Sequence, residues 1–183
     1  MSLVKEDKKR GFTLVLGGVR SGKSGFARDL CEDAEVRGNG RRVYLATAEA
    51  LDAEMERRIE RHRRERGKEW VTVEEPVEVA ASLSTMEQGS VILLDCLTLW
   101  LMNLMGLGLG DDEILERIET LARTLSESQS FVVVVSNDVG GGITPENAMA
   151  RRFADISGLM NQSMAVRAEE VFLMTAGLPG RLK

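Results

Sequence analysis

The stretch "FTLVLGGVRSGKS", residues 12–24, decides the fold. Gly17, Gly22, Lys23 and Ser24 match the phosphate-binding pattern G-x-x-x-x-G-K-[ST] at every required position. An apolar, strand-like run precedes the pattern and a run with helical spacing follows it, which is the context that a phosphate loop requires. The alternative is an ordinary glycine turn before a helix. The complete motif in this context favours the phosphate loop, so we expect a nucleoside triphosphate to bind here.

The residues of the loop indicate how it would hold phosphates. Glycines let the backbone approach anionic oxygens closely, and those of the loop are Gly17, Gly18 and Gly22. We expect Lys23 to reach the β- and γ-phosphates and the Ser24 hydroxyl to ligate Mg2+. Such sites usually take a second Mg2+-organising carboxylate from the end of another buried strand, and Asp95, which closes "VILLD", is the natural candidate. The alternative role for Asp95 is a helix N-cap at a strand–helix junction.

The rest of the chain repeats the order of strand and helix. Five short apolar runs predict strands at 12–16, 42–46, 91–95, 131–136 and 170–174. They are continuous rather than alternating, which is typical of strands buried on both faces of a parallel sheet. The clearest helical spacing between them lies at 23–36, 49–66, 111–128 and 146–167. We therefore predict an α/β fold of the phosphate-loop NTPase (RecA-like) type, a mostly parallel sheet flanked by helices, in a single domain over 11–183 with a flexible leader at 1–10.

Composition excludes several classes of function. The net charge of −5 and the isoelectric point near 5.1 argue against general nucleic-acid binding. The longest apolar runs are too short and too polar for a membrane span, and the charged N-terminus lacks a secretory signal. Cys31 and Cys96 are isolated thiols without metal-ligand spacing, which favours packing roles in a reducing cytoplasm.

An arginine-rich segment, "EALDAEMERRIERHRRERG" at 49–67, contains the only histidine of the chain, His62. One interpretation is a solvated helix laced with ion pairs, with the histidine on the apolar stripe of Leu51, Met55 and Ile59. The other starts from its position beyond the carboxyl end of the second predicted strand, where ligands bind in open α/β sheets. A histidine there could act as a nucleophile, with guanidinium groups neutralising the leaving group. The residues alone leave both interpretations open.

The glycine-rich stretch "NDVGGGITPEN" at 137–147 also has two interpretations. Asn137 and Asp138 could contact a substrate at the carboxyl end of the fourth predicted strand, or the stretch could be a flexible connection. Thr144 is well placed as the N-cap of the following helix. The apolar stripe of that helix predicts core or subunit-interface packing and consists of Met149, Phe153, Ile156, Met160 and Met164.

Five blocks of this sequence resemble, in the same order, the bifunctional adenosylcobinamide kinase / adenosylcobinamide-phosphate guanylyltransferase family. The blocks are "LGGVRSGKS" (16–24), "YLATAEALDAEMERRIERHRRER" (44–66), "WVTVEEP" (70–76), "LLDCLTLWLMNLM" (93–105) and "VSNDVGGGITPENAMARRFADISGLMNQSMA" (135–165). The resemblance implies a cytoplasmic homotrimer that uses Mg2+, ATP and GTP. It further implies phosphorylation of adenosylcobinamide, then transfer of GMP from GTP to adenosylcobinamide phosphate through a guanylylated histidine.

The resemblance also implies roles for individual residues. His62 stands at the motif position of the guanylylated residue, and Lys23 would be the second catalytic residue. The guanine-nucleotide site would be lined by Gly17, Gly18, Val19, Arg20, Ser21, Gly22, Lys23, Ser24, Ala46, Thr47, Ala48, Arg63, Arg64, Glu65, Arg66, Glu74 and Asp95. Ala48 can offer only backbone groups, since some family members have serine there. On its residues alone, the block with Glu74 could equally be an edge strand with solvated glutamates.

Two other classes of function compete with this one. The first is a simple phosphate-loop kinase that acts on another small alcohol without guanylyl transfer. The second is a nucleotide-switched binding protein or RecA-like module. The acidic net charge and the lack of an extended basic loop argue against the DNA-engaging form of this second class.

Overall fold

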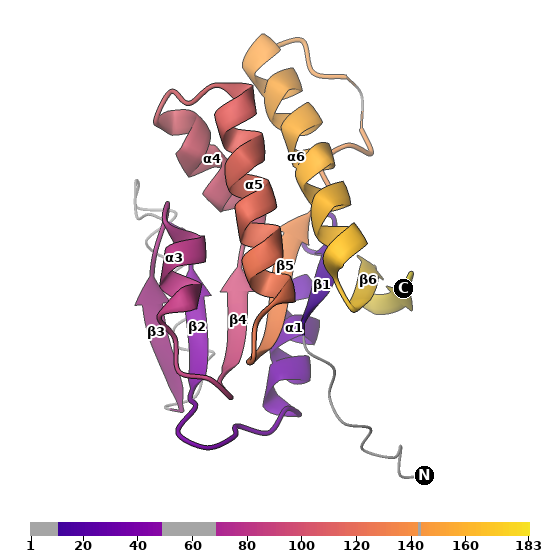
Figure 1. Ribbon diagram of the computed structural model, residues 1–183. Helices are drawn as coiled ribbons and strands as arrows, with labels where there is room; N and C mark the ends of the chain where they lie inside the picture. The colour runs from indigo at the N-terminus through magenta and orange to yellow at the C-terminus, as the bar shows by residue number, and fades with distance from the viewer. Residues whose placement is uncertain (1–10, 49–68, 143) are drawn as a thin grey trace.

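The computed structural model describes residues 11–48, 69–142 and 144–183, which form a seven-stranded sheet in the order β3-β2-β4-β5-β1-β6-β7 (Figure 1). The strands are β1 (Phe12–Gly17), β2 (Arg42–Ala46), β3 (Trp70–Glu74), β4 (Val91–Asp95), β5 (Phe131–Asn137), β6 (Glu170–Thr175) and β7 (Leu178–Arg181). Every pairing from β3 through β6 is parallel, and β7 adds an antiparallel edge. This arrangement confirms the predicted α/β class.

Helices cover both faces of the sheet. They are α1 (Lys23–Glu32), α3 (Val79–Ser84), α4 (Leu97–Gly106), α5 (Asp111–Ser126) and α6 (Ala148–Arg167). Of these, α1 packs on one face and α3 to α6 pack on the other. Figure 1 shows the two longest, α5 and α6, side by side along the sheet. No helix in the described ranges is long and apolar enough to cross a membrane.

The sheet separates two apolar cores, because successive strand residues point to opposite faces. In β1, Leu14 belongs to the core under α4, α5 and α6, whereas Val15 belongs to the smaller core under α1. The central strands are buried on both faces, which explains why their sequences are continuously apolar. Burial of these strands is the main stabilising contribution to the fold.

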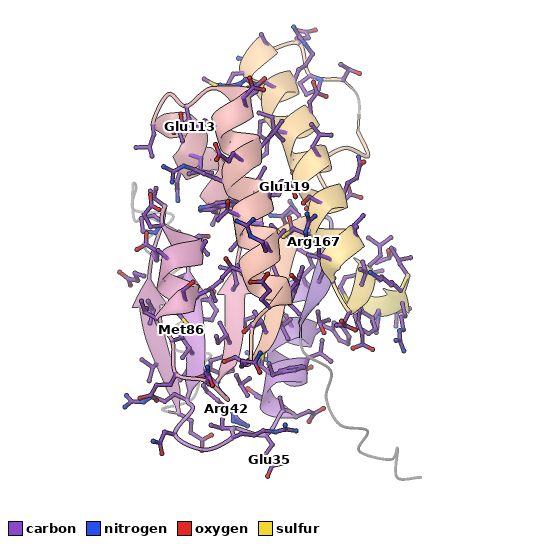
Figure 2. The ribbon with its side chains drawn as sticks, viewed as in Figure 1. Glu35, Arg42, Met86, Glu113, Glu119 and Arg167 are labelled. Atoms are coloured by element: carbon purple, nitrogen blue, oxygen red, sulfur yellow. The ribbon has the colours of Figure 1, made fainter. Side chains whose placement is uncertain are left out.

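A polar contact fastens α5 to α6 on the outer surface. Glu119 of α5 accepts hydrogen bonds from the Ser163 hydroxyl at 2.5 Å and from the Arg167 guanidinium at 2.5 Å. Figure 2 shows Glu119 and Arg167 pointing toward each other across the two helices. Since both side chains are partly exposed, this ion pair contributes little to the free energy of unfolding.

The structure corrects several details of the sequence prediction. The N-cap of α6 is Asn147, whose side chain accepts from the amides of Met149 and Ala150, so the assignment of Thr144 was wrong. Met149 is 63 % exposed and does not share the buried stripe of Ile156, Met160 and Met164.

Helix α1 ends at Glu32 rather than at residue 36. The "WVTVE" block is the edge strand β3, whereas α3, α4 and β7 were not predicted. The leader at 1–10 and the helix at 49–66 lie outside the described residues.

The parallel order brings six strand ends to one edge of the sheet, called here the carboxyl edge. These ends are Gly17 of β1, Ala46 of β2, Glu74 of β3, Asp95 of β4, Asn137 of β5 and Thr175 of β6. Strand β5 lies between β1 and β4. Ligands of open α/β sheets bind outside such an edge, so this is where a site is expected.

Candidate active site

The phosphate loop joins β1 to α1 at the carboxyl edge and needs glycine at both of its ends. Gly17 has a φ of 152°, and a Cβ there would lie 2.6 Å from the Met174 carbonyl oxygen. Gly22 has a φ of 98° and is the N-cap of α1. Between them, Val19 is exposed at the tip of the loop. The loop therefore presents backbone amides at a helix N-terminus, which is the arrangement that binds phosphates.

The Lys23 side chain folds back over this loop. Its Nζ donates a hydrogen bond to the Gly18 carbonyl oxygen at 2.6 Å, and the residue is only 7 % exposed. Burial lowers the pKa of Lys23, while the nearby Cys96 and Asp95 oppose that shift. An ammonium group in these surroundings gains from a phosphate partner, because it otherwise has little water around it. The structure thus places the Lys23 ammonium against the loop, and its contact with the β- and γ-phosphates stays a prediction.

A turn from the C-terminal hairpin supports the loop from behind. The Gly177 amide, between β6 and β7, donates to the Ser21 carbonyl oxygen at 3.0 Å. A Cβ on Gly22 would lie 3.2 Å from the Gly177 Cα, so the two backbones are in close contact. Sequence reasoning missed this support, since residues 155 positions apart along the chain carry no shared pattern.

Asp95 lies beside the first turn of α1. Its Oδ2 accepts from the Tyr44 hydroxyl at 2.9 Å, and the Ser24 hydroxyl approaches the same oxygen at 3.5 Å. The N-cap of α4 is Cys96, without a side-chain capping bond, so the alternative role of Asp95 as a cap is not observed. A carboxylate and a hydroxyl are hard oxygen ligands of the type that Mg2+ takes. Ser24 and Asp95 therefore fit a Mg2+ site, although no group of three or more acidic, histidine or cysteine side chains gathers among the described residues.

Thr47 follows β2 and is fully buried. Its hydroxyl donates to the Cys96 carbonyl oxygen at 2.7 Å and accepts from the Cys96 amide at 3.0 Å. Its own amide donates to the Asp95 carbonyl oxygen at 3.2 Å. Thr47 thus holds the backbone of Asp95 and Cys96 through both its amide and its hydroxyl. Contact between a nucleotide and the backbone of 46–48 stays a prediction.

Helix α4 fastens the segments that follow β2 and β3. Asn103 donates from Nδ2 to the Thr47 carbonyl oxygen at 2.8 Å and to the Pro76 carbonyl oxygen at 3.0 Å. Trp100 donates to the Val77 carbonyl oxygen at 2.8 Å. These polar groups sit in an otherwise apolar helix and could not be assigned roles from spacing alone.

Glu74 is not brought against the phosphate loop. Glu74 ends β3, which the strands β2, β4 and β5 separate from β1. Four strand spacings of about 4.8 Å place it roughly 19 Å from the end of β1. His62, Arg63, Arg64, Glu65 and Arg66 lie outside the described residues, and Ala48 at the carboxyl edge is the last described residue before them.

Comparison with known proteins identifies the family. The family described as cobinamide kinase / cobinamide phosphate guanyltransferase matches residues 13–182. The chain belongs to this family. It is accordingly a transferase of a bifunctional type, acting in cobalamin biosynthesis.

Relatives of known name extend along nearly the whole chain. The bifunctional adenosylcobalamin biosynthesis protein CobP of Pseudomonas aeruginosa is 43 % identical over 175 residues, covering 93 % of this chain and 96 % of the relative. Protein CobU of Escherichia coli, of the same description, is 36 % identical over 183 residues, covering 93 % and 98 %. A solved structure from Pyrococcus horikoshii OT3 shares the fold with a TM-score of 0.56 and 8 % identity, covering 96 % and 88 %.

Proposed function

We propose that this enzyme phosphorylates adenosylcobinamide with a nucleoside triphosphate and then converts the product to adenosyl-GDP-cobinamide with GTP. The observation that carries the proposal is the phosphate loop with Lys23 buried over it and Asp95 beside Ser24, in a chain of this family. That arrangement supports binding of a triphosphate with its terminal phosphates toward α1.

In the kinase step, the hydroxyl oxygen of the cobinamide side arm attacks the γ-phosphorus. The bond between that phosphorus and the β,γ-bridging oxygen breaks, the nucleoside diphosphate leaves, and the hydroxyl proton passes to solvent. The amides of 17–24 and the Lys23 ammonium hold the charge of the phosphates in place. Mg2+, when bound through Ser24 and Asp95, supplies further charge neutralisation.

In the guanylyl step, a ring nitrogen of His62 attacks the α-phosphorus of GTP and pyrophosphate leaves, which gives a phosphoramidate. A phosphate oxygen of adenosylcobinamide phosphate then attacks the same phosphorus, and the histidine is released. His62 is the only histidine in the sequence and occupies the family's motif position, and these two facts support the assignment. Arg63, Arg64 and Arg66 follow it directly and would neutralise the leaving group.

Incubation with GTP and Mg2+, followed by mass spectrometry of peptides, tests the covalent step. We expect GMP on the peptide that contains His62, stable in alkali and labile in acid. The His62→Ala variant should lose the modification and guanylyl transfer while keeping phosphorylation of adenosylcobinamide at least in part. Acid-labile GMP on that variant would refute the assignment, and phosphorylation without any guanylylation of the wild type would favour a simple kinase.

We also propose a homotrimer that works in the cytoplasm. Cys31 and Cys96 are buried and are not joined in a disulfide, which is consistent with a reducing compartment. The exposed apolar side chains Leu159 and Val166, one above the other on the outer side of α6, are consistent with a subunit contact. Light scattering at several protein concentrations measures the oligomeric state, and a monomer at all of them would contradict this part of the proposal.

A further inference from the structure

Asn137, from the "NDVGGG" loop, lies next to the phosphate loop. It is the last residue of β5 and is paired with Gly17, where the loop begins. The next amide, that of Asp138, donates to the Gly17 carbonyl oxygen at 3.1 Å. On its other side β5 pairs with β4, which ends at Asp95. Asn137 is therefore positioned between the two elements that carry the nucleotide site.

The side chain of Asn137 lies on the same face of the sheet as α1. Along β5, Val133 and Val135 pack in the core under α1, and side chains alternate between faces. Ser136 points to the opposite face, where its hydroxyl donates to Asn161 of α6 at 2.7 Å. Asn137 consequently returns to the face on which α1 begins with Lys23.

Hydrogen bonds fix the orientation of the Asn137 carboxamide. Nδ2 donates to the Thr98 hydroxyl oxygen at 2.6 Å and lies 4.0 Å from the Cys96 sulfur. Cys96 in turn lies near the Lys23 ammonium, as does Asp95. A carboxamide nitrogen carries two hydrogens: one goes to Thr98, and the other is directed at the Cys96 sulfur, a more distant and weaker acceptor than a phosphate oxygen. The residue is partly exposed rather than fully buried.

We propose that Asn137 donates this second Nδ2 hydrogen to the terminal phosphate of the nucleoside triphosphate held by the loop. Phosphate oxygens only accept hydrogen bonds, and the carboxamide nitrogen only donates, so the chemistry of the two groups matches. The contact makes Asn137 a specificity-determining residue that distinguishes a triphosphate from a diphosphate. The inference rests on the proposed function only in that a nucleoside triphosphate occupies the phosphate loop.

Calorimetric titration of the full chain with GTP and with GDP, each with Mg2+ and without corrinoid, tests this contact. Asn137→Asp keeps the shape of the side chain but places a carboxylate against the terminal phosphate. We expect the dissociation constant for GTP to rise at least about tenfold, or about 1.4 kcal/mol, with a change of less than about threefold for GDP. Asn137→Ala removes the donor without adding charge. It should raise the ratio of the GTP to the GDP dissociation constant by a smaller factor than Asn137→Asp does.

Asn147→Asp is the matched control. It makes the same change of charge, and aspartate caps a helix as well as asparagine does, so α6 is retained. We expect it to leave the ratio of GTP to GDP affinity unchanged. An equal loss of GTP and GDP affinity in Asn137→Asp would overturn the proposal, and if that variant does not fold, an unchanged ratio in Asn137→Ala would overturn it.

Failure of this inference is distinguishable from failure of the proposed function. The titrations contain no corrinoid and measure only nucleotide contacts. Phosphorylation of adenosylcobinamide by the wild-type enzyme is measured separately. A wild type that binds GTP with the expected Asn137 dependence but does not phosphorylate adenosylcobinamide would refute the proposed substrate and leave the Asn137 contact intact.

Discussion

Replacing Lys23 by methionine should separate nucleotide binding from stability. The ammonium lies almost fully buried over the phosphate loop, where burial lowers its pKa and it donates a hydrogen bond to the Gly18 carbonyl oxygen. Without nucleotide, methionine removes a desolvated charge and also removes one hydrogen bond worth about 1 kcal/mol. These effects oppose each other, so the nucleotide-free variant should melt within about 3 °C of the wild type.

The same substitution should remove most of the stabilisation by GTP. At 100-fold excess over the dissociation constant, ligand binding stabilises the wild type by about 2.7 kcal/mol. For a chain of this size that corresponds to a rise in Tm of about 5–10 °C. A hydrogen bond to a charged group contributes about 1.5–3 kcal/mol, so the variant should bind GTP roughly 10- to 150-fold more weakly. At the same GTP concentration and 100-fold weaker binding, stabilisation falls to about 0.4 kcal/mol, a rise in Tm of about 1–2 °C.

Thermal melting at pH 7–8, with and without GTP and Mg2+, measures both effects. Lys183→Met is the control, because that lysine caps the end of α6 through the carbonyl oxygens of Ala165 and Val166, away from the phosphate loop. The wild type bears the full burial cost of Lys23 below its folded-state pKa, and the cost fades as pH rises through that pKa toward 10.5. A Lys23→Met protein that keeps the full GTP-dependent rise in Tm would refute the assigned role of the lysine, and a large loss of Tm without nucleotide would show that it is structural.

Three further substitutions probe the neighbouring strand ends. Asp95→Asn should keep an acceptor for the Tyr44 hydroxyl but raise the Mg2+ concentration needed for GTP binding about tenfold. Titration calorimetry measures this concentration, and an unchanged Mg2+ dependence would exclude Asp95 as a ligand. Thr47→Val should lower the free energy of unfolding in urea by about 2–4 kcal/mol, because both backbone groups of Cys96 lose their partner. Thr47→Ser keeps the hydroxyl and should retain most of the wild-type stability. Equal losses in the two variants would contradict this role of the hydroxyl. Burial raises the pKa of Cys96 from 9.0 to about 11, so its contribution to stability is present below pH 9 and is lost as pH rises to 11. The difference in unfolding free energy between the wild type and Cys96→Ala should therefore decline by up to about 3 kcal/mol over that range, and a constant difference would contradict the shifted pKa.

The sequence was sufficient to predict the elements whose signal is local. The continuous apolar runs gave five parallel strands, because burial on both faces selects the same residue types at every position. Helix α4 has apolar residues on nearly all sides and therefore lacks the periodicity that reveals a helix. Strand β7 is fully exposed and contains Pro179 and Gly180, both of which argue against a strand when read alone. Its antiparallel pairing with β6 compensates for that weak local preference.

The residues of the phosphate loop could be predicted from the sequence, whereas the residues that hold the surrounding backbone in place could not. Lys23, Ser24 and Asp95 follow from a motif and a strand end, and the structure brings them together. The hydroxyl of Thr47 and the amide of Asn103 act across 49 and 56 positions of the chain, and no spacing rule connects such residues. Family resemblance could place Thr47 near the nucleotide but could not say that its hydroxyl is already used by Cys96.

Hydrogen bonds among Thr47, Cys96, Thr98 and Asn137 connect three strand ends along the carboxyl edge. Burying a polar group costs free energy unless it is hydrogen-bonded, and apolar side chains of the same shape would stabilise the sheet at least as well. The buried hydroxyls of this edge are instead paired with specific backbone and side-chain partners, which fixes the backbone around Asp95 and the carboxamide of Asn137. Precise placement of these groups matters where phosphate charge must be neutralised at a defined distance. The polar network at this edge is therefore better explained by the demands of phosphoryl and nucleotidyl transfer than by those of folding.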